Sequence, residues 1–132
     1  MNDQPGLPYI LDSSALIALI KKEKGAEVVA ANIKGAVMSS VNYAEVISVL
    51  VRKLSPEIAV SMLSKLITEV VAFDENMAVQ SGILYQQTKK HGLSLGDRAC
   101  IAMALAKGMR ILTADKIWAE LDLDVEIKYI RD

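Results

Sequence analysis

The sequence predicts an α/β fold in which a mostly parallel sheet is covered by helices on both faces. Short apolar runs alternate with longer stretches of helical periodicity along the chain. Helical stretches lie between the apolar runs, and a parallel return needs a crossover of about a dozen residues. The runs are nearly continuous in apolar character, which is typical of strands buried on both faces. No repeat or linker interrupts the pattern, so we expect one domain, residues 1–132.

The amino-terminal half predicts two strands and three helices. Gly25 ends the first helix. Ser55 stands where it can cap the last of these helices, and Pro56 takes the first helical position after it. In chain order, the elements are a strand in "YIL", a helix at about 14–22, a strand in "GAVMSS", and helices in "VNYAEVISVLVRK" and "SPEIAVSMLSKLI".

The carboxyl-terminal half predicts three strands and three helices. Its first strand, "EVVAF", has the β-branched and aromatic character of a short buried strand. Asp74 can cap a long helix that ends at Gly92, and Gly108 ends the next helix. The elements after "EVVAF" are helices in 74–92 and "SLGDRACIAMALAKG", a strand in "RILTA", a short helix in "DKIWAEL" and a strand in "VEIKYI".

Composition excludes several classes of protein. With 52% hydrophobic and 23% charged residues, the chain is neither disordered nor low in complexity. Its apolar runs are far shorter than the roughly 20 residues that span a bilayer, so we expect no membrane partner. "MNDQPGLP" lacks the pattern of a secretory signal, and the lone Cys100 is expected to be a buried reduced thiol. These features predict a cytoplasmic protein. The net charge of −1 does not by itself indicate binding to nucleic acid.

Three aspartates are predicted to lie at one edge of the sheet. Asp12 follows "YIL" and Asp115 follows "RILTA", which places both at carboxyl ends of strands. Asp97 lies in the opening turn of the helix that leads into the Asp115 strand, so it belongs to the same edge. A structural role is also open, because Asp12 can be a helix cap and Asp97 can form a capping box with Ser94.

Glu45 lies one turn inside a predicted helix, where no cap is needed. Asn42, Glu45, Ser48 and Arg52 recur at helical spacing and form a narrow polar stripe on an otherwise apolar helix. Such a stripe is either a solvated edge or the support of a functional carboxylate, and the pattern is compatible with both.

Four carboxylates at one edge would repel one another and raise some of their pKa values unless a cation compensated. Oxygen ligands suit Mg²⁺ or Mn²⁺. The sequence has no Cys/His set for zinc, and the lone His91 stands at a helix end that favours a solvated or dipole-facing role. It also lacks the glycine-rich loops that bind mononucleotides or dinucleotides. The acids therefore favour a magnesium or manganese site.

Four segments resemble the PIN-domain ribonucleases in wording, order and approximate spacing. The length and the "LSLGDR" segment most resemble the VapC-type toxins of toxin–antitoxin pairs. This resemblance spans nearly the whole chain and implies a PIN-like three-layer sandwich. It also implies a metal-dependent endoribonuclease that is the toxin of a type II pair. The segments are "YILDSSALIAL", "MSSVNYAEV", "LSLGDRACIAMA" and "ILTAD" followed by Trp118.

The resemblance also implies roles for individual residues. Four acids match the family's catalytic metal ligands for one or two Mg²⁺ or Mn²⁺ ions; they are Asp12, Glu45, Asp97 and Asp115. Ser13 or Ser14 matches the small hydroxyl residue beside the first acid, and Thr113 matches that of the last motif, in supporting roles. Lys116 and Ile117 stand where the family often has another acid, which leaves the number of ions open.

Arg98, beside Asp97, either contacts a substrate phosphate or makes a surface ion pair. The implied partners are an RNA substrate, a cognate antitoxin and a second copy in a homodimer. The segment "AVSMLSKLI" either lines a groove for the antitoxin or belongs to the core. Two other functions stay open. One is a receiver-like phosphate-handling domain, although the chain lacks the pair of acids expected near the first strand. The other is a catalytically inactive PIN-like scaffold.

Overall fold

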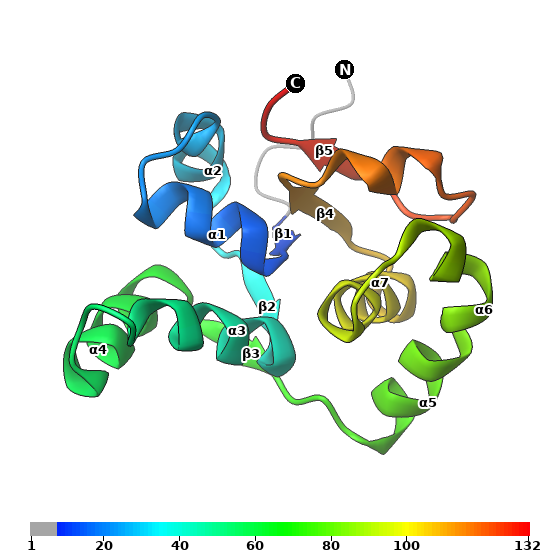
Figure 1. Cartoon of the computed structure of the whole chain (residues 1–132), viewed down its shortest axis with the longest axis horizontal. Helices are drawn as coiled ribbons and strands as arrows, with labels where there is room; N and C mark the ends of the chain where they lie inside the picture. Colours follow the sequence, from blue (N-terminus) through cyan, green and yellow to red (C-terminus); the bar gives the residue numbers. More distant parts are fainter. Residues whose placement is uncertain (1–7) are drawn as a thin grey trace.

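The computed structural model describes residues 8–132, which form a five-stranded sheet between two groups of helices (Figure 1). All strand pairings are parallel, in the order β3-β2-β1-β4-β5. The predicted α/β architecture is therefore confirmed. The strands are β1 (Tyr9–Leu11), β2 (Val37–Ser39), β3 (Glu69–Val71), β4 (Arg110–Thr113) and β5 (Ile127–Tyr129).

The helices form two groups, one on each face of the sheet. The first group is α1 (Ser13–Ile20), α2 (Ala26–Asn32), α3 (Ser40–Leu50) and α4 (Pro56–Leu66). The second group is α5 (Glu75–Ile83), α6 (Tyr85–Thr88), the 3₁₀ helix η1 (Lys89–His91) and α7 (Leu95–Lys107). A second 3₁₀ helix, η2 (Lys116–Glu120), connects β4 to β5.

Neighbouring residues of the central strands point into two separate cores. One core packs against α1 to α4 and the other against α7, so the central strands are buried on both faces. This two-sided burial explains why these strands are continuous apolar runs in the sequence. The first core takes Leu11, Met38 and Leu112, and the second takes Ile10, Val37 and Ile111.

The centre of the sheet is a topological switch point. In β1, Ile10 pairs with Val37 of β2 on one side and with Ile111 of β4 on the other. The chain therefore leaves β1 toward β2 and later returns to the opposite side of β1. In open parallel sheets, ligands bind in the crevice outside the carboxyl ends of strands at such a point. Asp12 directly follows β1 at this position.

Helix α2 is absent from the sequence-based prediction. The sequence predicts only that Gly25 ends a helix, whereas in the structure Gly25 lies between two helices and is the N-cap of α2. Its φ of +95° favours glycine, and a Cβ there would lie 2.6 Å from the Ile130 carbonyl oxygen. One glycine thus allows both the reversal of the chain and its close approach to the segment after β5.

The prediction of a buried strand in "EVVAF" was wrong, because β3 is an edge strand that pairs only with β2. Glu69 is exposed and so is Val70. The predicted long helix in 74–92 is divided into α5, α6 and η1, although Leu84 at the first break keeps a helical backbone with φ −60° and ψ −17°. The predicted helix in "DKIWAEL" is the 3₁₀ helix η2.

The structure also bears on three other expectations from the sequence. Cys100 is buried and reduced. In "AVSMLSKLI", Ala59 and Leu63 are fully buried in the core, whereas Met62 and Leu66 help to line a surface groove of about 520 Å³ on α4. Of residues 8–132, no helix is both long and apolar enough to cross a membrane. Most of "MNDQPGLP", on which the absence of a signal was judged, lies outside the described residues.

Candidate active site

Asp12 is buried at the carboxyl end of β1, with a relative exposure of 2%. It caps α1, because its Oδ1 accepts a hydrogen bond from the Ala15 amide at 3.0 Å. The Ser14 hydroxyl donates to Oδ1 at 2.8 Å, and the Thr113 hydroxyl donates to Oδ2 at 2.6 Å. The cap interpretation is therefore confirmed, but capping uses only one of the two carboxylate oxygens.

Ser14 and Thr113 connect this carboxylate to the end of β4. The Ala114 amide donates to the Ser14 hydroxyl oxygen at 3.0 Å. The Asp115 amide donates to the Thr113 hydroxyl oxygen at 3.0 Å. Because backbone groups hold both hydroxyls, their orientation toward Asp12 is fixed. These residues thus lie where a supporting role was predicted for them.

Burial raises the pKa of Asp12 from 3.8 to about 6. The hydrogen bonds from Thr113, Ala15 and Ser14 oppose this rise, and the negative charge of Asp97 adds to it. The main cause is thus loss of hydration rather than the mutual repulsion expected from the sequence. An added positive charge would stabilise the ionised form.

Glu45 reaches the same region from α3. This helix starts directly after β2, where the Ser39 hydroxyl accepts a hydrogen bond from the Val41 amide at 3.2 Å. The Oε1 atom of Glu45 accepts hydrogen bonds from the Ser13 hydroxyl at 2.8 Å and from the Asn42 amide group at 3.0 Å. Ser13 thereby connects the start of α1 to α3.

The polar stripe on α3 changes character along the helix. Asn42 is buried, Glu45 is half-buried, and Ser48 and Arg52 are exposed. The solvated-edge interpretation is therefore confirmed for Ser48 and Arg52. Its first turn faces the crevice, and its later turns face solvent.

Asp97 lies in the first turn of α7 and forms the predicted capping box with Ser94. Its Oδ2 accepts from the Ser94 amide at 2.9 Å, and its own amide donates to the Ser94 hydroxyl at 3.2 Å. Burial raises the pKa of Asp97, and the charges of Asp115 and Glu45 raise it further. Asp97 thus experiences the charges of acids on two other elements.

Asp115 completes the set at the start of η2. Its Oδ1 accepts from the Ile117 amide at 3.1 Å. Burial raises the pKa of Tyr129, at the end of β5, and the charge of Asp115 adds to that rise. Asp115 therefore lies on the β4–β5 side of the crevice.

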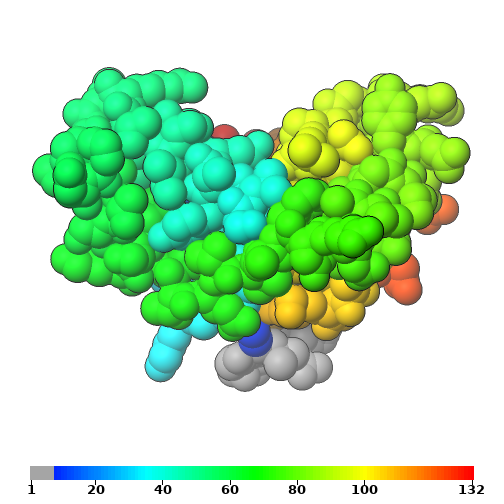
Figure 2. Space-filling view, turned by 90° about the horizontal axis from the view of Figure 1, so that it is seen from below, coloured from blue at the N-terminus to red at the C-terminus, as the bar shows by residue number. Residues whose placement is uncertain are grey.

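The buried thiol of Cys100, one turn after Asp97 in α7, lies close to three of these acids. Burial raises the pKa of this thiol, and the charges of Asp12, Asp97 and Glu45 raise it further. Contacts agree, because Ser13, the neighbour of Asp12, donates to Glu45, and Gly96, the neighbour of Asp97, lies against the Glu45 carboxylate. Three carboxylates from the end of β1, from α3 and from α7 therefore converge on one region of the protein. Figure 2 shows the surface hollowed between the side formed by α3 and α4 and the side formed by α6 and α7.

Arg98 is engaged away from this convergence. Its guanidinium donates to the Ser81 carbonyl of α5 at 3.0 Å and lies over the Tyr85 ring, 5.4 Å from its centroid. These contacts connect α7 to α5 and α6. They give Arg98 a role in holding the second helical group together.

Two residues of the site were not singled out by sequence reasoning. Asn42 was seen only as part of the polar stripe, and its amide group also donates to the Gly96 carbonyl at 3.1 Å. Gly96 itself lies against the carboxylate of Glu45. Its position next to Asp97, in the first turn of a helix where glycine is unfavourable, is the signal that could have identified it.

The four carboxylates fit a hard divalent cation in the chemistry of their donors. Within residues 8–132, however, no group of three or more His, Cys, Asp and Glu side chains is arranged to hold a metal ion as the side chains stand. Each of the four acids already accepts hydrogen bonds, for example from Ser94 to Asp97 and from Ser13 to Glu45.

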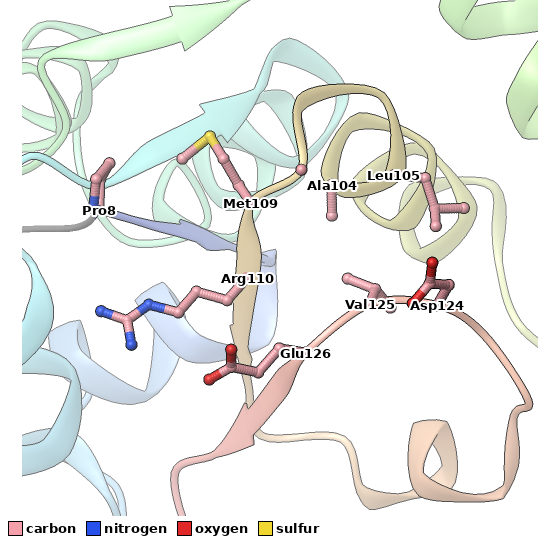
Figure 3. Close-up of a pocket in the computed structure, with 9 residues that line it drawn as sticks. Pro8, Ala104, Leu105, Met109, Arg110, Asp124, Val125 and Glu126 are labelled. Atoms are coloured by element: carbon pink, nitrogen blue, oxygen red, sulfur yellow. The ribbon is translucent and has the colours of Figure 1, made fainter. Parts of the chain in front are cut away.

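A separate cavity of about 350 Å³ lies at the opposite edge of the sheet (Figure 3). Its walls come from the start of β4 and the end of α7, and include Arg110, Asp124 and Glu126. None of the four predicted acids lines it, and Asp12 and Asp115 follow the opposite, carboxyl ends of β1 and β4, so this cavity does not belong to the candidate active site.

For the nuclease activity that the sequence resemblance implies, we predict that Asp115→Asn reduces activity less than Asp97→Asn does. Asp115 is the acid on the β4–β5 side, whereas Asp97 is affected by the charges of both Asp115 and Glu45. Initial rates of RNA cleavage, measured for the two purified variants side by side with Mn²⁺, test this order. A larger loss for Asp115→Asn would show that the ranking of the two carboxylates is inverted.

Comparison with known proteins agrees with this geometry. The family model of the PIN domain matches residues 9–123. No curated protein sequence matches the chain. Among solved structures, a toxin–antitoxin complex from Klebsiella pneumoniae is 21% identical, with a TM-score of 0.75, and the match covers 94% of this chain and 98% of that one.

Two further solved structures share the fold. The DNA-bound VapBC of Salmonella typhimurium is 19% identical with a TM-score of 0.72, over 94% of this chain and 98% of that chain. VapC20 of Mycobacterium tuberculosis, a toxin that cleaves the sarcin–ricin loop, is 16% identical with a TM-score of 0.70, over 89% and 98%. The family match spans most of the sequence and the same fold recurs in these proteins, so the chain belongs to the PIN domain family.

Proposed function

We propose that this protein is a metal-dependent endoribonuclease and the toxin of a type II toxin–antitoxin pair. The observation that carries the proposal is that four acids from separate elements lie beside the carboxyl ends of β1, β2 and β4, at the switch point of the sheet. Asp97 is influenced by Asp115 and Glu45, and it influences Asp12 in turn. A buried carboxylate among like charges is poorly suited to a structural role alone, and such perturbed groups in a crevice are typical of functional sites.

In this proposal Asp12, Glu45, Asp97 and Asp115 hold one or two Mg²⁺ or Mn²⁺ ions. When bound, such an ion supplies positive charge next to the phosphodiester and lowers the pKa of water. Ser14 and Thr113 keep the Asp12 carboxylate oriented through their hydrogen bonds. Asp97 or Glu45 orients the attacking water, or acts only as a ligand.

The same proposal includes partners and location. Similarity in fold to toxin–antitoxin complexes supports a cognate antitoxin as the partner, and we propose a homodimer of cytoplasmic toxin whose residues 1–132 form one PIN-like domain. The apolar groove on α4 is a surface to examine for antitoxin contacts. Arg98 stays a candidate for phosphate binding only if its contact with Ser81 opens.

The strand order argues against the receiver-like alternative. Receiver-like folds have the order 2-1-3-4-5, whereas this sheet has 3-2-1-4-5. The inactive-scaffold alternative differs from the proposal only in chemistry, so an assay has to separate the two.

The decisive experiment is cleavage of a mixed cellular RNA pool by the purified protein. We expect cuts with Mg²⁺ or Mn²⁺ that disappear when a chelator is added, because ionised carboxylates alone repel the phosphodiester. Sequencing of the new RNA ends would define the substrate. A homogeneous folded protein that leaves every RNA in the pool intact with either ion would support the inactive scaffold instead.

A further inference from the structure

We propose that Asn42 and Gly96 are positioning residues that fix the carboxylate of Glu45 between α3 and the start of α7. The inference rests on the proposed function, because Glu45 is one of the four acids assigned there. It extends that function to two residues that bear no charge and that would not themselves bind an ion. The argument comes from hydrogen bonds, close contacts and burial in the first turns of the two helices.

Asn42 uses its side-chain amide group as a bridge. The amide donates to Glu45 Oε1 at 3.0 Å and to the Gly96 carbonyl oxygen at 3.1 Å, so one group holds both partners. The side chain is 1% exposed, and its Oδ1 is buried without a hydrogen-bond partner among the described residues. Burying an unpaired acceptor is unfavourable for stability. This cost indicates that Asn42 is kept for its side-chain NH₂ group, which donates to Glu45 and Gly96.

Gly96 provides the space that the carboxylate occupies. A Cβ at this position would lie 2.6 Å from Glu45 Oε1, 2.7 Å from Cδ and closer still to Oε2. Both oxygens and the carboxyl carbon therefore fill the volume that any other residue would need. The backbone of Gly96 is helical, so alanine suits its conformation and only the clash with Glu45 opposes the change.

The two residues position Glu45 in different ways, Asn42 by a hydrogen bond and Gly96 by leaving space. Asn42 and the Ser13 hydroxyl both hold Oε1, and the absent side chain of Gly96 admits the whole carboxylate to the start of α7. Asp97 is the next residue of that helix. The contact with Gly96 therefore holds the Glu45 carboxylate beside the first turn of α7, in which Asp97 lies.

Gly96→Ala tests this arrangement, with Gly82→Ala as its matched control. Gly82 is an exposed glycine in α5, and a Cβ there would meet nothing within 4 Å. We expect Gly96→Ala to weaken Mn²⁺ binding to the free protein roughly 10- to 100-fold, as is usual for residues that orient metal ligands. Gly82→Ala should bind as the wild type does. Isothermal titration calorimetry with MnCl₂ gives both affinities without RNA.

A measurement on the metal-free protein separates this inference from the proposed function. The side-chain amide protons of Asn42 should exchange with water more slowly than those of the exposed Asn76, as observed by NMR. Gly96→Ala should shift the Asn42 amide resonances and speed their exchange, and Gly82→Ala should leave both unchanged. If the wild-type protein neither binds Mn²⁺ nor cleaves RNA, the proposed function fails. The exchange of the Asn42 amide protons still decides whether Asn42 and Gly96 hold the Glu45 carboxylate.

Two outcomes would overturn the inference. The first is fast exchange of the Asn42 amide in the wild type, at the rate of Asn76. The second is a folded Gly96→Ala protein whose Asn42 amide resonances match those of Gly82→Ala. If the wild type binds Mn²⁺, equal Mn²⁺ affinities of Gly96→Ala and Gly82→Ala would overturn the inference as well. A double variant supplies a further check. In Glu45→Asp, whose side chain is shorter by one carbon, Gly96→Ala should weaken Mn²⁺ binding by a smaller factor than in the wild type.

Discussion

Asp97→Asn is expected to abolish metal-dependent RNA cleavage while the protein stays folded. The substitution removes one negative charge at nearly constant volume, and the asparagine Oδ1 can still accept the hydrogen bond that Asp97 accepts from the Ser94 amide. The helix cap is therefore kept and the acidic cluster loses its central charge. We expect the cleavage rate to fall about 100-fold or more, beyond the usual effect of residues that only orient a ligand.

The matched control for this variant is Asp74→Asn. Asp74 likewise stabilises a helix start with its carboxylate, because as the N-cap of α5 it accepts a hydrogen bond from the Met77 amide at 2.9 Å, and its side chain is exposed. Any loss caused by weakening a helix cap should appear in both variants. Cleavage rates and thermal unfolding are measured on proteins purified in the same way. Undiminished cleavage by folded Asp97→Asn would remove Asp97 from the active site.

Asp12→Asn should have two effects of opposite sign, because it abolishes cleavage and stabilises the metal-free protein. Burial raises the pKa of Asp12 from 3.8 to about 6, and each pKa unit corresponds to about 1.4 kcal/mol, so ionised Asp12 opposes folding by about 3 kcal/mol. Asparagine avoids this penalty. In the variant, the side-chain amide group of residue 12 can donate to the Thr113 hydroxyl oxygen. The Thr113 hydroxyl can then donate to the Ser14 hydroxyl, which lies 3.3 Å away.

The stability gain depends on pH in a defined direction. Below pH 4, Asp12 is mostly protonated in both the folded and the unfolded chain, so wild type and variant differ little. Between the unfolded pKa of 3.8 and the folded value of about 6, the folded chain binds more protons, and wild-type stability falls as the pH rises. Above about pH 6 to 7 the difference levels off. The variant should therefore gain most at pH 8.

Urea unfolding with a chelator at pH 4 and pH 8 tests this prediction, with Asp74→Asn as the control for a change of cap chemistry. Equal free energies of unfolding for Asp12→Asn and wild type at pH 8 would show that burial of the ionised Asp12 carboxylate does not destabilise the folded protein. Addition of Mn²⁺ should stabilise the wild type and leave Asp12→Asn nearly unchanged, since a ligand that binds only the folded state shifts unfolding by mass action.

The sequence predicts most elements and the edge on which the acids lie, because these depend on local patterns. Apolar runs identify β1, β2 and β4, and Ser94 followed by Asp97 three residues later identifies the start of α7. The edge position of β3 is not a local property. "EVVAF" has the composition of a buried strand, and only the pairing of β3 with β2 alone leaves Val70 exposed.

The same distinction applies to the site. Asp12, Ser14 and Thr113 stand in recognisable positions next to strand ends, so their proximity follows from a parallel sheet. The contact of Asn42 with Gly96 depends on how α3 packs against α7, two helices separated by more than 40 residues. No periodicity within either helix encodes that packing. The bridge that Asn42 forms to Gly96 is therefore visible only in three dimensions.

The central position of β1 has a consequence for the synthesis of the chain. Asp12 is synthesised well before its hydrogen-bond partner Thr113, which follows 101 residues later at the end of a strand that pairs directly with β1. Contacts of such large sequence separation form late, and a growing chain folds from its amino-terminal end. A chain that stops before β4 has three of the four acids and no intact crevice. Translation must therefore run past β4 before the proposed active site can form.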